Sequence, residues 1–440
     1  MNDLRQKVSS SKMAFLKTAS IEAQQRSNAL KRIADELIAK TPQILAANEK
    51  DLEATKPLVE KGEISEALFK RLKLSESKIR DMAVGVQSVE ELANPVGKTL
   101  SCLELDRGLE LFQITVPIGV ICTIFESRPD ALIQISSLCI KSANAVILKG
   151  GTEAQNSNQI LATIVRDALR ENNLPVDLVQ LIETREDVKN ILTMDDLIDL
   201  IVPRGSNEFV SFIQKNTNIP VLGHASGICH EYVAQDADLN KAYSICFDAK
   251  VQYPAVCNAM ETLLVDEAIS EQFLPEMAKK YLDAGVELRG DQRVVAVLQA
   301  HDIDIKEASE EDWTYEYNDL ILSIKIVGDM NEAIDFINRC GSAHTDGIIT
   351  ENKEKALAFI TRVDSSSVVW NASTRFSDGY RYGKGAEVGI ATGKIHTRGP
   401  AGIDSLLTYK YVLVGDGHVV ANYSGNDARK FTHRKLEKSW

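Results

Sequence analysis

Apolar residues recur at helical spacing through the first hundred residues of the chain. The positions are Ile33, Leu37, Ile44, Ile64, Leu68, Leu72 and Ile79. This spacing gathers apolar side chains on one face of each helix and predicts a helical region. We expect the region to end at Asn94-Pro95, because proline disfavours a helical conformation in the residue before it. These helices are expected to pack on the domain that follows rather than to carry chemistry.

A different pattern follows the helical region. Residues 101–115 alternate apolar and polar side chains around Asp106-Arg107-Gly108. Alternation has the period of a β-strand, and glycine supplies the backbone freedom that a tight turn requires. The segment therefore predicts a β-hairpin with Gly108 in its turn.

Between residues 118 and 234, short apolar runs alternate with helical segments. The runs are 118–125, 145–149, 178–182, 198–202, 220–222 and 232–234. Buried parallel strands joined by crossover helices have this pattern, which predicts a Rossmann-like open sheet. The sequence contains no G-x-G-x-x-G, so the ordinary dinucleotide fingerprint is absent.

Two glycine turns follow strands of this predicted sheet. They are Lys149-Gly150-Gly151 and Arg204-Gly205-Ser206, and each precedes a helix. The free N–H groups at a helix start can bind phosphate, so both turns are candidates for cofactor binding. Glycine is also common in turns that bind no ligand, and an ordinary turn is the alternative for both segments.

A second α/β pattern runs from about residue 257 to residue 383 and indicates another domain. Its apolar runs are 262–265, 286–288, 324–327, 347–349 and 368–370. The acidic segment 307–319, which contains Trp313, Tyr315 and Tyr317, is expected to be a surface loop. The basic tail after Gly425 is expected to be solvated and partly disordered.

Cys257 lies at a predicted junction within K-V-Q-Y-P-A-V-C-N-A-M-E-T-L-L-V, residues 250–265. A helical pattern over 237–249 ends before it, Pro254 breaks the backbone, and the apolar run 262–265 follows. A thiol on such a turn, flanked by Gln252 and Asn258, is both reachable and directed, as a reactive cysteine requires. The alternative is a small buried apolar residue.

Composition narrows the class of protein. A chain of 440 residues with 44% hydrophobic and 26% charged residues is typical of a globular protein of two or three domains. Its apolar runs are shorter than the roughly 20 residues of a membrane span, and the formal net charge of −13 argues against nucleic acid. The seven scattered cysteines and the absence of a signal-peptide pattern predict a cytoplasmic location and no metal site.

Seven further segments join the Cys257 segment in a resemblance to a known family. They are V-P-I-G-V-I-C-T-I-F-E-S-R-P-D (116–130), N-A-V-I-L-K-G-G (144–151), P-R-G-S (203–206), G-H-A-S-G-I-C-H-E-Y-V (223–233), G-S-A-H-T-D-G-I (341–348), N-A-S-T-R-F-S-D-G (371–379) and G-A-E-V-G-I-A-T-G-K-I-H-T-R-G-P (385–400). In this order they resemble the gamma-glutamyl phosphate reductase (glutamate-5-semialdehyde dehydrogenase) family of the aldehyde dehydrogenase superfamily. The resemblance covers roughly residues 21–418, and segments in sequence are more specific than one alone.

The resemblance implies an aldehyde dehydrogenase-like α/β fold with a Rossmann-like cofactor domain, an α/β catalytic domain and a small β oligomerisation element. The corresponding divisions are 1–100 and 116–236 for NADP binding with N-terminal helices, 237–400 for catalysis, 101–115 and 401–418 for oligomerisation strands, and 419–440 for a tail. In the superfamily the hairpin reaches a neighbouring subunit, and its counterpart here is 406–414. Unpaired edge strands favour pairing with a partner chain, so we expect a homo-oligomer, most simply a dimer.

The resemblance also assigns a cofactor. Many NAD-using members carry a Glu three residues after the lysine at the strand end, where it binds the ribose hydroxyls. Thr152 occupies that position here, beside Lys149. Because an acid would repel a 2′-phosphate and Lys149 tolerates one, we expect NADP(H). The expected cofactor contacts are Lys149, Gly150, Gly151, Thr152, Gly205, Ser206 and Glu387, the last near the nicotinamide ribose.

The implied reaction is the NADPH-dependent reduction of L-glutamyl 5-phosphate to L-glutamate 5-semialdehyde with release of phosphate, the second step of proline synthesis from glutamate. Cys257 would form a thioester, and the backbone N–H of Cys257 or Asn258, with Ser127, would stabilise the oxyanion. Hydrolytic relatives place a base-forming Glu where this chain has Val221. Without that carboxylate, water is a poor acceptor for the thioester.

Anionic groups of the substrate call for guanidinium partners, which bind phosphate and carboxylate in bidentate fashion. Arg128, Arg375 and Arg398 are the candidates, with Glu126 or Asp378 for the ammonium group and His396 as a further contact. His344, like His396, is raised as a candidate only by its setting in a family motif. Each of these residues has a structural ion pair or buried hydrogen bond as its alternative.

Two other functions compete with this one. One is an NAD-linked hydrolytic aldehyde dehydrogenase, and the other is a non-catalytic binding or structural protein on the same scaffold. The expected partners are the small-molecule substrate and a second copy of the chain, with glutamate 5-kinase as a candidate functional partner. We expect neither a nucleic acid nor a membrane partner.

Overall fold

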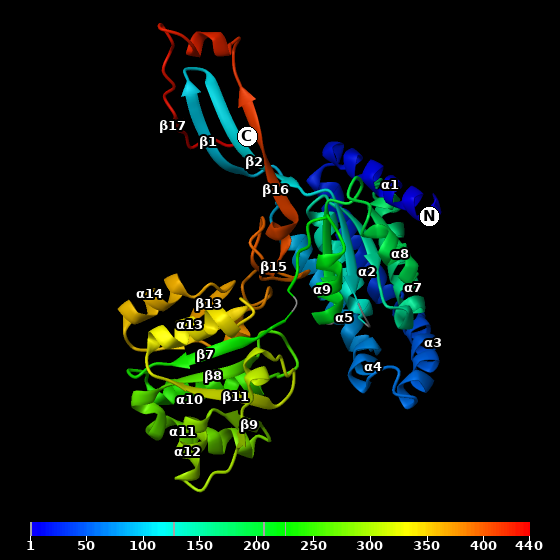
Figure 1. Ribbon diagram of the computed structural model, residues 1–440. Helices are drawn as coiled ribbons and strands as arrows, with labels where there is room; N and C mark the ends of the chain where they lie inside the picture. The colour runs from blue at the N-terminus through cyan, green and yellow to red at the C-terminus, as the bar shows by residue number, and fades with distance from the viewer. Residues whose placement is uncertain (1, 126–127, 206, 225) are drawn as a thin grey trace.

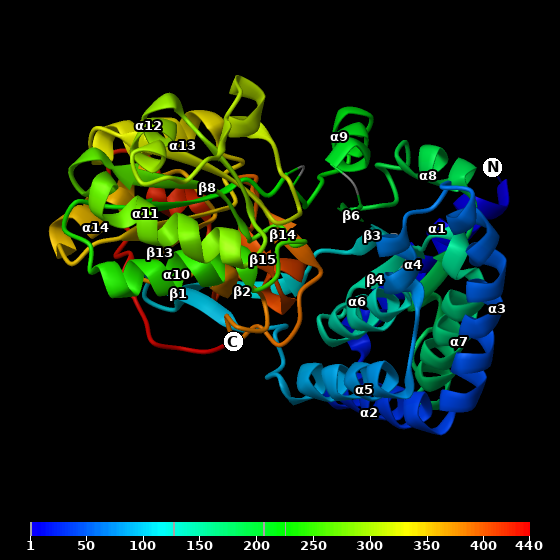
Figure 2. The same cartoon turned by 90° about the horizontal axis from the view of Figure 1, so that it is seen from below.

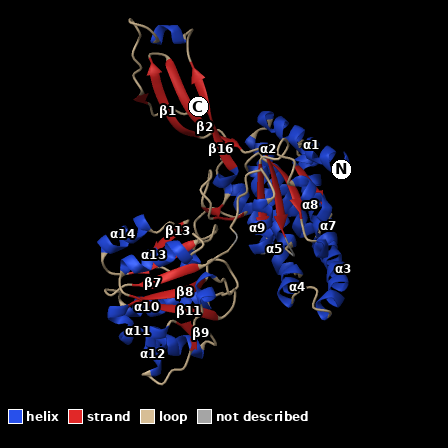
Figure 3. Cartoon of the chain, viewed as in Figure 1, coloured by secondary structure: helices blue, strands red, loops and turns tan. Residues whose placement is uncertain are grey.

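The computed structural model describes residues 2–125, 128–205, 207–224 and 226–440. Two α/β lobes and a projecting arm of strands make up the molecule (Figure 1). Colouring by secondary structure separates the helix-covered lobes from the strand-rich arm (Figure 3). We name the lobes by the size of their sheets: the smaller lobe, built on four strands, contains the N-terminal helices and the predicted Rossmann-like segment, and the larger lobe is built on seven strands.

The helical prediction for the first hundred residues is confirmed. The helices there are α1 (Asn2–Lys17), α2 (Ala23–Ala39), α3 (Thr41–Glu60), α4 (Glu66–Leu72) and α5 (Glu76–Glu91). Ile33, Leu37, Ile44 and Ile79 are fully buried in the core of the smaller lobe. Figure 2 shows α2 and α5 side by side along one flank of this lobe, with α3 beside α7 (Gln155–Glu171).

The smaller lobe is built on a parallel sheet of order β5-β4-β3-β6. Its strands are β3 (Val120–Phe125), β4 (Ala145–Lys149), β5 (Val179–Ile182) and β6 (Leu200–Arg204). Its other helices are α6 (Pro129–Lys141), α8 (Arg185–Ile191) and α9 (Asn207–Lys215). The strand order reverses between β3 and β6, and open α/β sheets bind ligands at the carboxyl ends of strands beside such a reversal.

The larger lobe holds a parallel sheet of order β10-β9-β11-β8-β7-β12-β13. Its strands are β7 (Cys229–Val233), β8 (Met260–Asp266), β9 (Glu287–Gly290), β10 (Lys306–Glu307), β11 (Ile321–Val327), β12 (Thr345–Ile349) and β13 (Ser367–Trp370). Its helices are α10 (Leu239–Val251), α11 (Glu267–Asp283), α12 (Gln292–Gln299), α13 (Met330–Cys340) and α14 (Lys353–Arg362). β14 (Gly389–Ala391) pairs with β15 (Gly399–Ala401) in a separate ribbon.

One strand lies in a different sheet from the one expected. The run 232–234 was placed with the Rossmann-like sheet, but β7 is hydrogen-bonded between β8 and β12 in the larger lobe. The run 220–222 contributes an isolated bridge between Ile201 and Val221. Both runs have the apolar character of a buried parallel strand, and that character does not reveal which sheet a strand joins.

The arm confirms the predicted hairpin and corrects the prediction for the tail. β1 (Thr99–Asp106) and β2 (Leu109–Pro117) are antiparallel around Gly108, whose φ is 76°. β16 (Leu407–Val414) pairs with β2, and β17 (Arg434–Lys435) pairs with β1. Most residues after Gly425 are exposed, as predicted, but the end of the segment is held on the arm, because Leu436 packs on the buried Phe112 cluster and Trp440 contacts the Phe112 ring at 5.5 Å between centroids.

The acidic segment 307–319 is also more buried than its composition suggests. Trp313 is 6% exposed and packs in a core cluster with Phe336. Arg289 forms an ion pair with Asp312 at 2.6 Å, which lets the carboxylate enter a partly buried position. The prediction of a surface loop is wrong for Trp313. The packing partner Phe336 and the ion-pair partner Arg289 both lie outside the segment, so the composition of the segment does not reveal its burial.

Among the described residues, no helix combines the length and the apolar character that a membrane crossing requires.

Candidate active site

Cys257 lies at the amino end of β8, in the loop that connects α10 to this strand. The residue is partly exposed, as the sequence pattern predicts. Gly227 approaches the loop so closely that a side-chain Cβ there would lie 2.3 Å from the carbonyl oxygen of Cys257. Glycine at residue 227 therefore allows the segment before β7 to pack against the loop.

A buried ion pair spans the base of this loop. Lys250 in the last turn of α10 donates to Glu261 on β8 at 2.6 Å, and both side chains are buried. Desolvation raises the pKa of Glu261 to about 7 and lowers the pKa of Lys250, while each partner opposes the shift of the other. The backbone N–H of Asn318 donates to the second oxygen of Glu261 at 3.2 Å. The pair thus fixes the two ends of the segment that carries Cys257.

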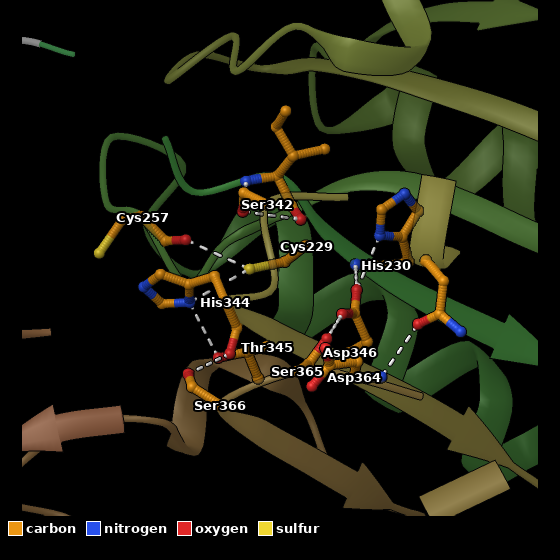
Figure 4. Close-up of polar contacts among 12 residues, drawn as sticks. Cys229, His230, Cys257, Ser342, His344, Thr345, Asp346, Asp364, Ser365 and Ser366 are labelled. Carbon is orange, nitrogen blue, oxygen red and sulfur yellow. Dashed lines mark hydrogen bonds and ion pairs between the residues drawn. The ribbon is translucent and has the colours of Figure 1, made fainter. Parts of the chain in front are cut away.

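Cys229 and His344 lie beside Cys257, the predicted nucleophile (Figure 4). The thiol of Cys229 donates to the carbonyl oxygen of Cys257 at 3.2 Å. His344 Nδ1 lies 2.9 Å from Thr345 Oγ1 and 3.6 Å from Cys229 Sγ. His344 is fully buried, and its Nε2 has no hydrogen-bond partner among the described residues. These contacts join the amino ends of β7, β8 and β12.

His224 completes this group from the segment that leads into β7. Its Nδ1 donates to the carbonyl oxygen of Ile390 at 3.0 Å, and its ring lies 5.0 Å from that of His344. Burial lowers the pKa of His224, so the imidazole is neutral near pH 7. A nitrogen of His224, a nitrogen of His344 and Cys257 Sγ lie within 4.8 Å of one another. His224 was not identified from the sequence. The residue directly follows Val221-Leu222-Gly223, in which Val221 occupies the position of the Glu of hydrolytic relatives.

Two arginines interact electrostatically with Cys257, the predicted nucleophile. They are Arg204, at the end of β6, and Arg375. Burial lowers the pKa of each guanidinium, but arginine remains protonated at any ordinary pH. Arg375 is a predicted substrate contact, whereas Arg204 is named from the sequence only as the first residue of the second glycine turn. Both can stabilise a thiolate and attract an anionic substrate.

Other predicted residues shape the wall of the site beside Arg375. Asn258 is 4% exposed and donates to the carbonyl oxygen of Ser377 at 2.8 Å, so its side chain supports the backbone. Asp378 accepts from the N–H groups of Tyr380 and Arg381.

Glu387 belongs to the same wall. It accepts from the N–H of Gly379 at 2.9 Å and lies 3.8 Å from Arg204. Burial raises the pKa of the Glu387 carboxyl.

Three of the predicted cofactor residues line a pocket at the carboxyl ends of β4 and β5. Gly150, Gly151 and Thr152 form one side, with Leu181 and Glu183 opposite. A Cβ at residue 150 would lie 2.2 Å from Asn158 Nδ2, so this close approach requires glycine. Lys149 is buried and donates to the carbonyl oxygen of Gly150 at 2.6 Å.

The other glycine turn follows β6, which β3 separates from β4 in the sheet. Gly205 comes directly after Arg204 there, while Ser206 lies outside the described residues.

Three other predicted substrate contacts have hydrogen-bond or ion-pair partners within the protein. Arg398 donates to Asp364 at 2.8 Å and to the carbonyl oxygen of Thr392 at 3.1 Å. His396 is exposed, and its Nε2 lies 2.8 Å from the carbonyl oxygen of Ser405. Arg128 pairs with Asp130 at 3.3 Å and lies near enough to Arg204 to lower the pKa of that guanidinium. The predictions for Glu126 and Ser127 concern residues outside the described ranges.

The comparison with protein families defines the class. The model of the aldehyde dehydrogenase family matches residues 1–308. A glyceraldehyde-3-phosphate dehydrogenase from Methanocaldococcus jannaschii, solved as a complex with NADP, shares the fold with a TM-score of 0.63 at 17% identity, over 94% of each chain. The chain belongs to the aldehyde dehydrogenase family and is an oxidoreductase.

Closer relatives place it within that family. Gamma-glutamyl phosphate reductase from Methanococcoides burtonii is 55% identical over 99% of this chain and 97% of its own length. The crystal structure of gamma-glutamyl phosphate reductase from Thermotoga maritima has a TM-score of 0.91 at 37% identity, covering 94% of this chain and 99% of the other. The gamma-glutamyl phosphate reductases are thus the group to which this sequence is assigned.

The buried pair at the base of the nucleophile loop yields a stability prediction. Glu261→Gln removes one charge and leaves Lys250 buried without a counterion, which should lower the free energy of unfolding by about 3–5 kcal/mol. The double variant Lys250→Met/Glu261→Leu removes both charges and should recover most of that loss. Urea denaturation followed by circular dichroism measures both effects. If the single and the double variant were destabilised equally, the loss would not come from leaving Lys250 buried without its counterion.

Proposed function

We propose that the chain reduces L-glutamyl 5-phosphate to L-glutamate 5-semialdehyde with NADPH, releasing phosphate. The single observation that carries the proposal is the setting of Cys257. It is a partly exposed thiol at the amino end of β8 that interacts electrostatically with Arg204 of the smaller lobe and with Arg375. The family relatives support this choice of substrate.

The chemistry begins with the thiolate of Cys257, which attacks the acyl carbon and expels phosphate to form a thioester. A reduced nicotinamide supplies hydride to that carbon when it is bound. The resulting thiohemiacetal collapses, its oxygen becomes the aldehyde oxygen, and Cys257 leaves as the thiolate. Negative charge develops on the carbonyl oxygen at each addition, and backbone N–H groups at Cys257 or Asn258 are the proposed donors.

Arg204 and Arg375 are the proposed partners of the phosphate and carboxylate groups. Both lie close to Cys257, whereas Arg398 is committed to Asp364. Asp378 is the proposed partner of the ammonium group, because its carboxylate lies on the segment that Asn258 supports.

Hydrolysis of the thioester is disfavoured because Val221 supplies no carboxylate to activate water. His224 is a neutral imidazole nearby that donates its Nδ1–H to the carbonyl of Ile390, so its Nε2 is the nitrogen on which the hydrolytic alternative would depend as a base. The hydrolytic alternative therefore differs from the proposal in one measurable respect, which is whether aldehyde oxidation needs phosphate. The non-catalytic alternative leaves the exposed, arginine-flanked thiol without a role.

The pocket beside β4 and β5 is the proposed binding site for the adenosine half of NADP(H). Close approach at Gly150 and the helix start after it suit a pyrophosphate or ribose phosphate. Lys149 is the proposed 2′-phosphate contact, with Thr152 as a neutral neighbour. Glu183 lines the same pocket and opposes a 2′-phosphate, so the lysine must outweigh it.

A homodimer is the proposed assembly. β16 forms an edge of the arm sheet, and Tyr409, Tyr411 and Leu413 on it are each more than half exposed. An apolar edge strand left in water is a template for pairing with another chain. The other edge is covered by β17, so the second copy is expected at β16. A cytoplasmic location and functional coupling to glutamate 5-kinase remain proposals; the former agrees with seven free cysteines.

Activity can be tested in the oxidative direction. The cyclised form of glutamate 5-semialdehyde should reduce NADP only when phosphate or arsenate is present, because phosphate is the acceptor of the thioester. Cys257→Ala should abolish this activity, while Cys340→Ser, at another partly exposed thiol, should retain it. Absorbance at the NADPH band measures the rate. Phosphate-independent oxidation would favour the hydrolytic alternative.

Cofactor choice can be tested at Thr152. Thr152→Glu places a carboxylate beside the proposed 2′-phosphate. Repulsion between these two negative groups should raise the KM for NADPH about tenfold or more. Thr152→Gln has similar size without the charge and should change it little. Steady-state kinetics with NADPH and NADH separate the two effects. If Thr152→Glu raised the KM for NADPH and the KM for NADH equally, the 2′-phosphate would not lie beside residue 152.

Assembly can be tested by sedimentation velocity. The unmodified chain should sediment as a dimer, and Tyr411→Glu/Leu413→Glu should shift it to a monomer by placing charges on the proposed interface strand. Leu357→Glu, at an equally exposed leucine on α14, serves as the control and should remain dimeric. A monomeric unmodified chain would remove the proposal.

A further inference from the structure

The three side chains nearest the reactive sulfur have the chemistry of metal ligands. Cys257 offers a thiolate, and His224 and His344 offer imidazole nitrogens, all within 4.8 Å of one another. Thiolate and imidazole are the ligands that zinc prefers in proteins. The sequence gives no indication of the group, because Cys257, His224 and His344 come from three separate segments and lack the spacing of a zinc motif.

The hydrogen bonds of the two imidazoles have the form found at zinc sites. A ligating histidine usually donates its second N–H to a carbonyl, carboxylate or other acceptor, which fixes the tautomer and orients the ring. His224 uses Nδ1 in this way with the carbonyl oxygen of Ile390 at 3.0 Å. His344 has Nδ1 beside Thr345 Oγ1 at 2.9 Å.

His344 provides a second and independent indication of a ligand. Its ring is 0% exposed, and Nε2 has no hydrogen-bond partner among the described residues. A buried polar nitrogen without a partner is costly. Figure 4 shows the ring of His344 lying beside Cys257, behind the partly exposed thiol. A metal ion bound to Nε2 and to Cys257 Sγ would satisfy the orphaned nitrogen.

We propose that Cys257, His224 and His344 form a zinc-binding site whose occupation reversibly blocks the nucleophile. Zn²⁺ would bind the thiolate as the thiol proton passes to solvent, and both histidines would bind as neutral ligands. The fourth position would remain open to water, since Cys257 is partly exposed. Because bond lengths to zinc are about 2.0–2.3 Å, the ligands must close by roughly 1 Å, which rotation of the Cys257 side chain can supply.

The surrounding charge sets the site apart from a permanent structural zinc site. Arg204 and Arg375 lie near Cys257 and oppose a dication, while the thiolate and Glu387 attract it. The balance favours binding that a chelator can reverse. Bound zinc would hold the sulfur away from the acyl carbon, so the metal acts as an inhibitor.

Zinc binding can be measured without any enzyme assay. Reduced, chelator-stripped protein is titrated with Zn²⁺ alone in competition with a chromogenic chelator. We expect about one equivalent to bind, with at least about tenfold weaker binding in His224→Gln and in Cys257→Ser. Cys340→Ser and His301→Gln, at a partly exposed thiol and an exposed histidine, should bind zinc as the unmodified chain does. Mg²⁺ should not compete, since these ligands are too soft for it.

A second measurement follows the thiol directly. Zn²⁺ should slow alkylation of Cys257 by iodoacetamide, detected by peptide mass mapping, and EDTA should restore the rate. His224→Gln is the decisive variant, because His224 is partly exposed and its replacement is compatible with folding, whereas His344 is buried. Zinc affinity unchanged in His224→Gln, or alkylation of Cys257 unaffected by Zn²⁺, would overturn the proposal. Either result would leave the reductase proposal untouched.

Discussion

The buried pair of Lys250 and Glu261 is the constraint on which the geometry of the site depends. It joins the end of α10 to β8 and holds the loop between them at both ends. Removing two charges from water costs free energy, and apolar residues of similar volume in their place often stabilise a protein as much or more. Their directional hydrogen bond, with a further one from Asn318 at 3.2 Å, supplies the fixed geometry that the nucleophile requires.

The two lobes contribute opposite ends of their sheets to the site. The smaller lobe offers the carboxyl ends of β3, β4 and β6, where helix N-termini and glycine turns suit phosphate groups. The larger lobe offers the amino ends of β7, β8 and β12, where Cys229, Cys257 and His344 meet. The proposed cofactor site and the proposed nucleophile therefore lie on different lobes. Arg204, at the end of β6, is the described side chain that carries the electrostatic link between them.

Much of this arrangement could be predicted from sequence, because buried parallel strands leave continuous apolar runs and Cys257 stands at a helix-to-strand junction. The remainder depended on contacts between distant segments. The sheet to which β7 belongs is set by its neighbours rather than by its own residues. Arg398 lies within a family motif, but the motif does not reveal that the guanidinium pairs with Asp364. His224 reaches Cys257 through a fold that brings residues 224, 257 and 344 together, which no local pattern records.

The last residue of the chain has a consequence for spectroscopy. Trp440 packs edge-on against Phe112 in the arm, whereas Trp313 and Trp370, the other two tryptophans of the sequence, belong to the larger lobe. Replacing those two with phenylalanine would leave Trp440, packed on the arm, as the single tryptophan of the sequence. Its emission would then report the docking of the C-terminus on the arm without any added dye, and a fusion attached after Trp440 would disturb that signal.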